Sequence, residues 1–178
     1  MRQDGREIRE QEQEHQVWLS LGSNMGDRFE TLIGGAVYLL THGLKLICCS
    51  GVYETEPVGY ADQPDFYNMV LHGASALEPL ALLALCQQAE KAYLRERVIH
   101  WGPRTLDVDI LYIGEMILDM PELTIPHPRI PERAFVLGPL ADMEPGILEK
   151  WKLSAKYEGI RLIVPAQDVL ARLTKAGF

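Results

Sequence analysis

The chain has 178 residues, 47% of them hydrophobic and 24% charged, and its formal net charge is −8 at pH 7. This length is enough for one domain with a full hydrophobic core, and the composition is ordinary for a soluble globular protein. The negative charge argues against nucleic-acid binding as the main role. It does not exclude a nucleotide substrate, because metal ions and a few arginines can reverse the sign of the charge inside a pocket.

Targeting and redox features are few. The sequence has no apolar run long enough to span a membrane, and its first residues lack the apolar region of a signal peptide. Cys48, Cys49 and Cys86 show neither a metal-binding spacing nor a disulfide framework, which is typical of reduced, buried thiols. We therefore expect a soluble, cytoplasmic protein.

Residues 1–16 contain one aliphatic side chain, Ile8, among charged residues and glutamines. Such a composition cannot bury enough apolar surface to fold by itself, so we expect a disordered tail. The sequence that follows has no internal repeat and no sign of a second domain. We expect residues 17–178 to form a single domain.

The first predicted elements are a strand, a loop and a helix. The apolar run 17–21 predicts a buried strand, and 22–27 is a loop of turn-forming residues. Asp27 is a typical N-cap for the helix predicted over 28–41, where apolar residues recur at helical spacing. The loop lacks the lysine of a P-loop and the glycine spacing of a dinucleotide site, but it could still shape one wall of a site.

The rest of the chain alternates between strands and helices. It predicts, in order, a strand over 44–53, a turn-rich loop over 55–63, a strand over 66–76, a helix over 78–97, a strand over 106–113 with a short return at 116–118, a proline-stiffened loop over 125–132, and helices over 133–143 and 169–175. The first six regular elements follow the order β-α-β-β-α-β. This order predicts an α+β, ferredoxin-like fold in which helices pack on one face of a mainly antiparallel sheet, the other face is free for a site, and further elements follow at the C-terminus.

Two carboxylates share one face of the strand predicted over 106–113. Because side chains alternate along a strand, Asp107 and Asp109 point one way while Val108 and Ile110 point into a core. The two carboxylates start about 6.6 Å apart, which suits two hard cations with room for phosphate and water. Both could instead be solvent-facing residues of a half-exposed strand. Metal ligation is the better interpretation, because Asp is a poor strand former and two like charges repel each other.

Arg104 and Trp101 flank a Gly-Pro turn directly before the aspartate pair. After a proline that fixes its backbone, Arg104 is better interpreted as a bidentate phosphate clamp than as a surface arginine in a weak ion pair. Trp101 is either a stacking face for a flat heterocycle or a packed hydrophobe, and the local sequence does not separate the two. His127 stands between two prolines, a stiff position that suits either a proton donor to a phosphate leaving group or a structural histidine.

Other polar residues carry weaker signals. Gln87 and Glu90 share one side of the helix predicted over 78–97, which by default is a solvated face. Asn68 lies in an apolar strand and needs hydrogen-bond partners from the backbone or from a ligand. Arg133, near a predicted helix start, means little by itself.

Together these residues resemble the 6-hydroxymethyl-7,8-dihydropterin pyrophosphokinase family of folate biosynthesis. The matching segments occur in the family's order and cover most of residues 17–145: LGSNMGDR at 21–28, YETEPVG at 53–59, DQPDFYN at 62–68, WGPRTLDVDIL at 101–111, IPHPR at 125–129 and RAFVLGPL at 133–140. The resemblance implies a ferredoxin-like enzyme that transfers pyrophosphate from ATP to the pterin hydroxymethyl group and releases AMP. It also implies two Mg²⁺ ions, no covalent enzyme intermediate, small-molecule partners only, no nucleic-acid or membrane partner, and a monomer.

The resemblance also assigns roles to individual residues. By the family pattern the metal ligands are Asp107 and Asp109, which are also catalytic together with Arg95, Arg97 and Arg104. The ATP-binding residues are Gln87, Glu90, Arg104, His127 and Arg133. The pterin-binding residues are Thr55, Val58, Phe66, Asn68, Trp101 and Phe135, with the two phenylalanines on either side of the ring and Asn68 at its polar edge.

Three positions depart from the family pattern. The family usually has Gly at the position of Leu94, Val at that of Glu96 and Arg at that of His100, so the basic loop that closes over ATP is expected to close more slowly or with a pH dependence. A non-catalytic nucleotide- or pterin-binding protein with the same fold is the competing interpretation. A two-metal nuclease is a weaker alternative, because the acidic charge and a single aspartate pair fit it poorly.

Overall fold

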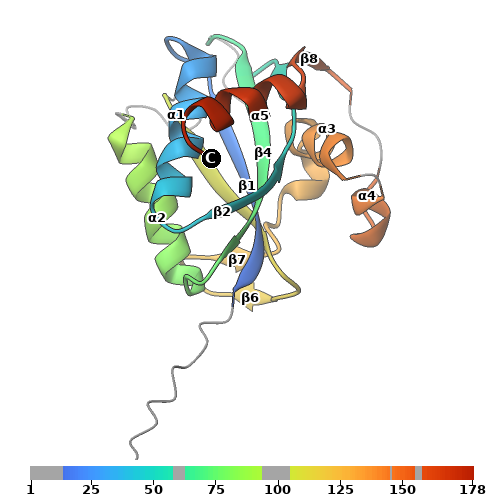
Figure 1. Ribbon diagram of the computed structural model, residues 1–178. Helices are drawn as coiled ribbons and strands as arrows, with labels where there is room; N and C mark the ends of the chain where they lie inside the picture. The colour runs from blue at the N-terminus through green and yellow to red at the C-terminus, as the bar shows by residue number, and fades with distance from the viewer. Residues whose placement is uncertain (1–13, 58–62, 94–104, 145, 155–157) are drawn as a thin grey trace, which may run out of the picture.

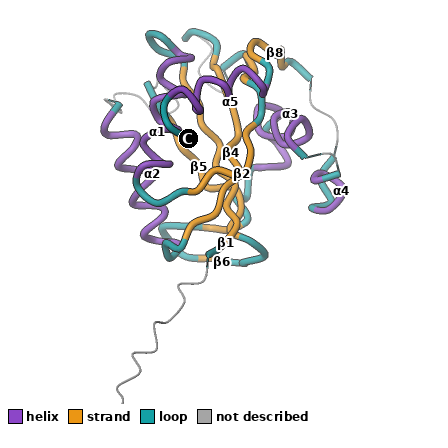
Figure 2. The backbone as a smooth tube through the Cα atoms, viewed as in Figure 1, coloured by secondary structure: helices purple, strands orange, loops and turns teal. Residues whose placement is uncertain are grey.

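The computed structural model describes residues 14–57, 63–93, 105–144, 146–154 and 158–178. Within these residues an antiparallel six-stranded sheet lies at the centre, and helices cover both of its faces (Figures 1 and 2). The strands are β1 (His15–Ser23), β2 (Lys45–Cys49), β3 (Val52–Thr55), β4 (Phe66–Ser75), β5 (Asp107–Ile113) and β8 (Ile160–Val164). Neighbours follow the order β5-β1-β4-β3-β8, and β2 also pairs with β4. A separate two-stranded ribbon is formed by β6 (Leu118–Asp119) and β7 (Thr124–Ile125).

The helices divide between the two faces of the sheet. One face is covered by α1 (Arg28–Thr41), α2 (Pro79–Ala92) and α5 (Ala166–Lys175). The other face is partly covered by the short 3₁₀ helix η1 (Ile130–Glu132), α3 (Ala134–Met143) and α4 (Ile147–Lys150). Figure 1 shows α1 and α2 on one side of the strands and α3 and α4 on the other.

Alternation along β1 explains both layers. Leu19 and Leu21 belong to the main core with α1, α2 and α5, whereas Trp18 belongs to a second core with α3 and α4. The expectation that the second face would be free is therefore wrong in part. Trp18 of β1 and Val70 of β4 are large apolar side chains on that face, and their burial requires a cover, which α3 supplies.

Several predicted elements are found where the sequence places them. The helix predicted over 28–41 is α1, and the Asp27 side chain caps it by accepting a hydrogen bond from the Glu30 N–H (3.1 Å). The strand predicted over 44–53 is instead divided into β2 and β3, both paired with β4. Ser50 lies between them and is hydrogen-bonded to the Val70 backbone through its own N–H and its hydroxyl, so the ladder continues across the break.

Other boundaries differ from the prediction. Strand β1 begins at His15, so residues 15 and 16 belong to the sheet and not to the predicted tail. The predicted helix over 78–97 ends at Ala92 in the described residues, with Tyr93 as its C-cap. Strand β8, which the sequence pattern did not predict, pairs with β3 along the edge of the sheet. Among the helices of the described ranges, none combines the length and the apolarity that a membrane span needs.

Candidate functional site

A cavity of about 200 Å³ lies on the sheet face opposite α1 and α2, beside the start of α3. Four neighbouring strands, β5, β1, β4 and β3, contribute side chains to it. Loops and α3 complete its wall. The cavity is lined by Ser20, Gly22, Thr55, Glu56, Gln63, Phe66, Asn68, Asp107, Asp109, Arg129, Glu132, Arg133 and Phe135.

The aspartate pair of β5 lies on the cavity side as predicted. Asp107 and Asp109 line the cavity, while Val108 and Ile110 are buried in the main core. Arg133, just before α3, donates a hydrogen bond from Nη1 to Asp109 Oδ2 at 2.5 Å. The arginine side chain is 16% exposed and the aspartate 31%, so this charge-assisted contact is partly shielded from water and orients the carboxylate.

His127 approaches Asp109 from the proline-stiffened loop. Its Nδ1 accepts a hydrogen bond from the backbone N–H of Arg129 (3.2 Å). The backbone N–H of His127 donates to the Leu111 carbonyl of β5 (2.9 Å). Because Nδ1 accepts, Nε2 is the protonated nitrogen, and it lies 3.9 Å from Asp109 Oδ2. Burial lowers the pKa of His127, and the nearby Arg133 and Arg129 lower it further while Asp109 opposes them. The imidazole is therefore neutral at pH 7, with an N–H directed toward the carboxylate side of the cavity.

The two aspartates fit a hard divalent cation. Carboxylate oxygens are the ligands that Mg²⁺ prefers, and proteins bind it through one or two carboxylates together with substrate phosphates and water. In the part of the chain that the structure describes, no three His, Cys, Asp or Glu side chains cluster as a metal cage. A cation held by Asp107 and Asp109 would thus take its remaining ligands from phosphate and water, and it would be bound together with a substrate.

One wall of the cavity is aromatic. Phe66 and Phe135 line it, and the buried Asn68 donates a hydrogen bond from Nδ2 to Thr55 Oγ1 (2.9 Å). A Cβ on Gly22 would lie 3.1 Å from Asn68 Oδ1 and 3.8 Å from the Phe66 ring. The absence of a side chain at Gly22 therefore leaves this end of the cavity open, and the loop predicted to shape a wall does so at its first residue.

Three predicted site residues of the described ranges do not line the cavity: His127, described above, and Gln87 and Glu90. Gln87 is exposed on α2. Glu90, on the same helix, is buried, and its Oε1 accepts a hydrogen bond from the Val108 N–H at 3.0 Å, so it is not on the solvated face that is the default for such a residue. Glu90 instead joins α2 to β5 beneath the aspartate pair.

Several other predicted positions lie outside the described residues. They are Val58, Arg95, Arg97, Trp101 and Arg104 among the site residues, and Leu94, Glu96 and His100 among the departures.

Some cavity residues were not predicted from the sequence. Ser20 is the polar residue of the apolar run 17–21, and it lies two residues before Gly22, so alternation could have placed both on the site face. Arg129 follows the second proline of the stiff loop, a position as restricted as that of His127. Gln63 and Glu132 carry no signal in the local sequence; Gln63 lies at the cavity where Asn24 Nδ2 donates to its side chain (3.0 Å).

Sequence comparison identifies relatives over most of the chain. The model of the 7,8-dihydro-6-hydroxymethylpterin-pyrophosphokinase family matches residues 18–145. The 2-amino-4-hydroxy-6-hydroxymethyldihydropteridine pyrophosphokinase of Bacillus subtilis is 44% identical over 150 residues, which cover 82% of this chain and 89% of that protein. The Pseudomonas aeruginosa protein of the same name is 42% identical over 132 residues, covering 74% of this chain and 82% of that one.

Longer proteins contain the same region. The mitochondrial folate synthesis bifunctional protein of Arabidopsis thaliana is 40% identical over 136 residues, which are 76% of this chain but 24% of that protein. The solved structure of wild-type Plasmodium falciparum HPPK-DHPS superposes with a TM-score of 0.62 at 16% identity, over 85% of this chain and 48% of the other. The chain thus spans about half of the Plasmodium chain, and at this identity the likeness concerns the fold alone.

Proposed function

Because the chain belongs to the 7,8-dihydro-6-hydroxymethylpterin-pyrophosphokinase family, we propose that it transfers pyrophosphate from ATP to 6-hydroxymethyl-7,8-dihydropterin. The products are AMP and the pterin diphosphate, in a step of folate biosynthesis. The observation that supports this function best is the composition of the cavity, whose lining combines two carboxylates with two phenylalanines and a buried amide. The carboxylates suit a metal-bound triphosphate, and the phenylalanines and the amide suit a flat, polar-edged ring.

Asp107 and Asp109 are the proposed ligands of two Mg²⁺ ions. When bound, Mg²⁺ neutralises phosphate charge, which is the main catalytic requirement of phosphoryl transfer. Arg133 holds the Asp109 carboxylate in place and supplies a positive charge at the phosphate end, and the His127 N–H is a hydrogen-bond donor on the same side. No nucleophilic side chain is needed, because positioning and charge compensation carry the reaction without a covalent enzyme intermediate.

The pterin is proposed to bind between Phe66 and Phe135. Asn68 has its amide nitrogen directed to Thr55, so its Oδ1 is the group that would accept a hydrogen bond from the ring edge. Burial makes this contact selective, because a ring without the matching donor would leave a buried acceptor unpaired. Affinity would come from the aromatic faces and selectivity from the amide.

Further assignments rest on the family resemblance and remain predictions. They are ATP binding by Gln87 and Glu90, catalytic roles for Arg95, Arg97 and Arg104, and pterin contacts from Val58 and Trp101. The strand order β5-β1-β4-β3, with α1 and α2 between successive strands, supports a ferredoxin-like core within a single domain over 17–178. The three free cysteines are consistent with a cytoplasmic location, and we expect a monomer whose partners are ATP and the pterin, without nucleic acid or membrane.

The decisive experiment is an assay of the purified protein with ATP, Mg²⁺ and the hydroxymethyl pterin. We expect one AMP to appear for each pterin diphosphate formed, and no AMP when the pterin is omitted. A variant with both Asp107→Asn and Asp109→Asn is the matched control and should form no AMP. Binding of ATP and pterin without AMP formation would instead favour the non-catalytic binding protein.

A further inference from the structure

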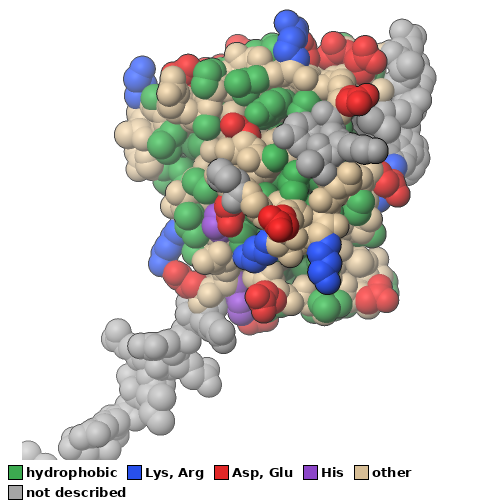
Figure 3. Space-filling model, turned by 90° about the vertical axis from the view of Figure 1, so that its right-hand side faces the viewer, with side chains coloured by type: hydrophobic (Ala, Val, Ile, Leu, Met, Phe, Trp, Pro, Cys, Tyr) green, Lys and Arg blue, Asp and Glu red, His purple; other side chains and the backbone are tan. Residues whose placement is uncertain are grey.

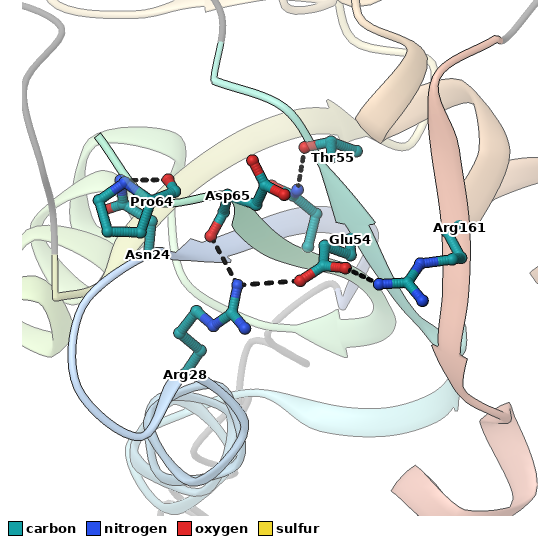
Figure 4. A network of polar contacts seen from close by, with 8 residues as sticks. Asn24, Arg28, Glu54, Thr55, Pro64, Asp65 and Arg161 are labelled. Carbon is teal, nitrogen blue, oxygen red and sulfur yellow. Dashed lines mark hydrogen bonds and ion pairs between the residues drawn. The ribbon is translucent and has the colours of Figure 1, made fainter. Parts of the chain in front are cut away.

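Three charged side chains from three different elements meet in one cluster (Figure 4). Arg28 at the start of α1 donates from Nη1 to Glu54 Oε1 of β3 at 3.1 Å. Arg161 of β8 contacts the other oxygen of the same carboxylate, Oε2. The hydrogen bond from Arg161 is the main cause that lowers the pKa of Glu54, and Arg28 adds to it, so the carboxylate stays ionised in ordinary assay conditions.

Arg28 also contacts the segment that enters β4. The same Nη1 donates to the Asp65 carbonyl at 2.8 Å, and the guanidinium lies 3.7 Å from the centroid of the Tyr67 ring. Asn24, in the loop before α1, donates from Nδ2 to the Pro64 carbonyl at 3.0 Å. The backbone carbonyls of Pro64 and Asp65 are therefore held by side chains from the loop before α1 and from its first residue.

The residues next to these contacts in the sequence line the cavity. Thr55 follows Glu54 and holds Asn68, and Phe66 follows Asp65. Alternation turns Glu54 and Tyr67 toward Arg28 of α1, whereas Thr55 and Asn68 line the cavity. Arg28 itself does not line the cavity, so any effect on a ligand must pass through the backbone of β3 and β4.

We propose that Arg28 is a positioning residue for the pterin pocket, fixing the Phe66 wall relative to Thr55 and Asn68 by its joint contacts with Glu54 and Asp65. This inference rests on the proposed function, because it takes the part of the cavity lined by Phe66, Thr55 and Asn68 to be the pterin site. Arginine suits the role because its planar group can stack on Tyr67 while it donates to two oxygens. Arg161 lies beyond the family match over 18–145, so the C-terminal strand of this chain contributes to the same support.

The contributions of the two arginines should differ. The Arg28 side chain is 25% exposed and has three partners, whereas that of Arg161 is 74% exposed. An exposed ion pair contributes little, since water and salt screen it. Arg28 is thus the residue to test, and Arg161→Ala should have a much smaller effect.

The test compares Arg28→Met, which keeps the length of the side chain but removes its donors, with Arg28→Lys. For Arg28→Met we expect the dissociation constant and the KM for the pterin to rise about tenfold, since a displaced binding group commonly costs this much or more. The KM for ATP should change much less. Arg28→Lys should recover part of the loss, because the ammonium keeps the charge and the donors but not the planar contact with Tyr67.

Arg172→Ala is the matched control. Arg172 of α5 forms an ion pair with Glu30 of α1 at 2.7 Å. The substitution therefore removes a surface contact of the same helix without affecting residues 63–65. The KM for the pterin should be that of the wild type. The double variant Arg28→Met with Glu54→Gln should raise the pterin dissociation constant no further than the stronger single variant. The reason is that both substitutions disrupt the same contact between Arg28 and Glu54.

Two results would overturn the inference. One is an unchanged pterin dissociation constant in Arg28→Met, and the other is an equal rise in the KM values for pterin and ATP, which would indicate general loosening of the fold. Pterin binding is measured without turnover by fluorescence titration. A wild-type protein that binds pterin but forms no AMP would therefore refute the proposed function and still leave the role of Arg28 decided by the binding data.

Discussion

Asp109 shows how neighbours far away in the sequence prepare a single side chain for its role. Strand alternation turns it to the cavity, Arg133 holds one of its oxygens at 2.5 Å, and the neutral His127 stands 3.9 Å from the same atom. The second carboxylate oxygen is separate from both of these contacts. The residue is thereby oriented but still able to bind a cation.

Replacing Asp109 with Asn keeps its size and removes its charge. We expect AMP formation to fall at least about 100-fold, the loss typical when one charge-stabilising group is removed. Pterin binding should stay close to that of the wild type, because the aromatic wall is untouched. The same change at the exposed Asp119 of β6 serves as control. Near-normal turnover in Asp109→Asn would refute the metal-ligand assignment.

Gly22 offers a test of the part of the cavity that holds Asn68. In Gly22→Ala the new Cβ would approach Asn68 Oδ1 to 3.1 Å and displace the amide that we assign to the pterin edge. We expect the KM for the pterin to rise about tenfold while that for ATP is retained. If crowding of Asn68 is the cause, adding Gly22→Ala to Asn68→Ala should not raise the KM for the pterin any further. A further loss of similar size in the double variant would contradict this explanation.

At the scale of elements, the C-terminal segment is part of the fold although the family match ends at residue 145. Helix α5 buries Val169 and Leu173 in the main core, whereas Leu170 on the same helix is 46% exposed. Strand β8 joins β3 and supplies Arg161 to the contact with Glu54. The sheet edge that carries Thr55 is therefore covered by residues from the end of the chain.

The two leucines of α5 form a matched pair for measuring this contribution. Leu173→Ala should lower the free energy of unfolding by about 2–5 kcal/mol, the usual cost of a core Leu→Ala change. Leu170→Ala should cost clearly less, because its side chain is already 46% exposed in the folded protein. Urea denaturation of both variants provides the measurement. Similar losses in the two variants would mean that α5 does not pack as described.

Element boundaries illustrate what local pattern can and cannot predict. Helix α1 and its Asp27 cap were predicted correctly, since helical spacing and a capping residue are local features. Strand β8 was not predicted, because as a half-exposed edge strand it shows no clean alternation. The division of β2 from β3 was also missed. Both halves pair with β4 and share one apolar pattern, so only the position of Ser50 in the ladder separates them.

At the scale of the whole molecule, the sheet separates a large core from a smaller one, and the site shares its face with the smaller core. Trp18 stacks on His72 there, with ring centroids 4.1 Å apart, and His72 Nδ1 lies 3.7 Å from the Cys48 sulfur. His72 Nε2 is buried and has no hydrogen-bond partner among the described residues. Figure 3 shows the side on which α3 and α4 lie, where the described Lys and Arg side chains are interspersed with acidic and uncharged ones.

His72 gives the stability of the molecule a predictable pH dependence. Burial lowers its pKa from the ordinary value of 6.5, Lys150 lowers it further, and Glu144 opposes them. The unfolded chain therefore binds a proton that the folded molecule resists, so stability should fall as the pH drops below about 6.5 toward the folded-state pKa. His127 is shifted in the same direction and adds to this slope.

Melting temperatures measured between pH 8 and pH 5 test this expectation. His72→Gln should flatten the decline below pH 6.5 without abolishing it, since His127 keeps its share. A parallel decline in wild type and His72→Gln would exclude His72 as a cause. The absolute stability of the variant is not informative here, because it also loses the stacking contact with Trp18.

Features that depend on neighbouring residues follow from the local sequence alone. Alternation placed Asp107 and Asp109 on one face of β5, and motifs indicated the family as well as Phe66, Asn68 and Phe135 as cavity residues. Only the tertiary structure decided which distant groups meet. It brought Arg133 to Asp109, Glu90 to the backbone of β5, and Arg28 and Arg161 to Glu54. The reason is physical: periodicity encodes which face a side chain takes, whereas contacts across the sheet depend on strand register and helix packing, which no local pattern contains.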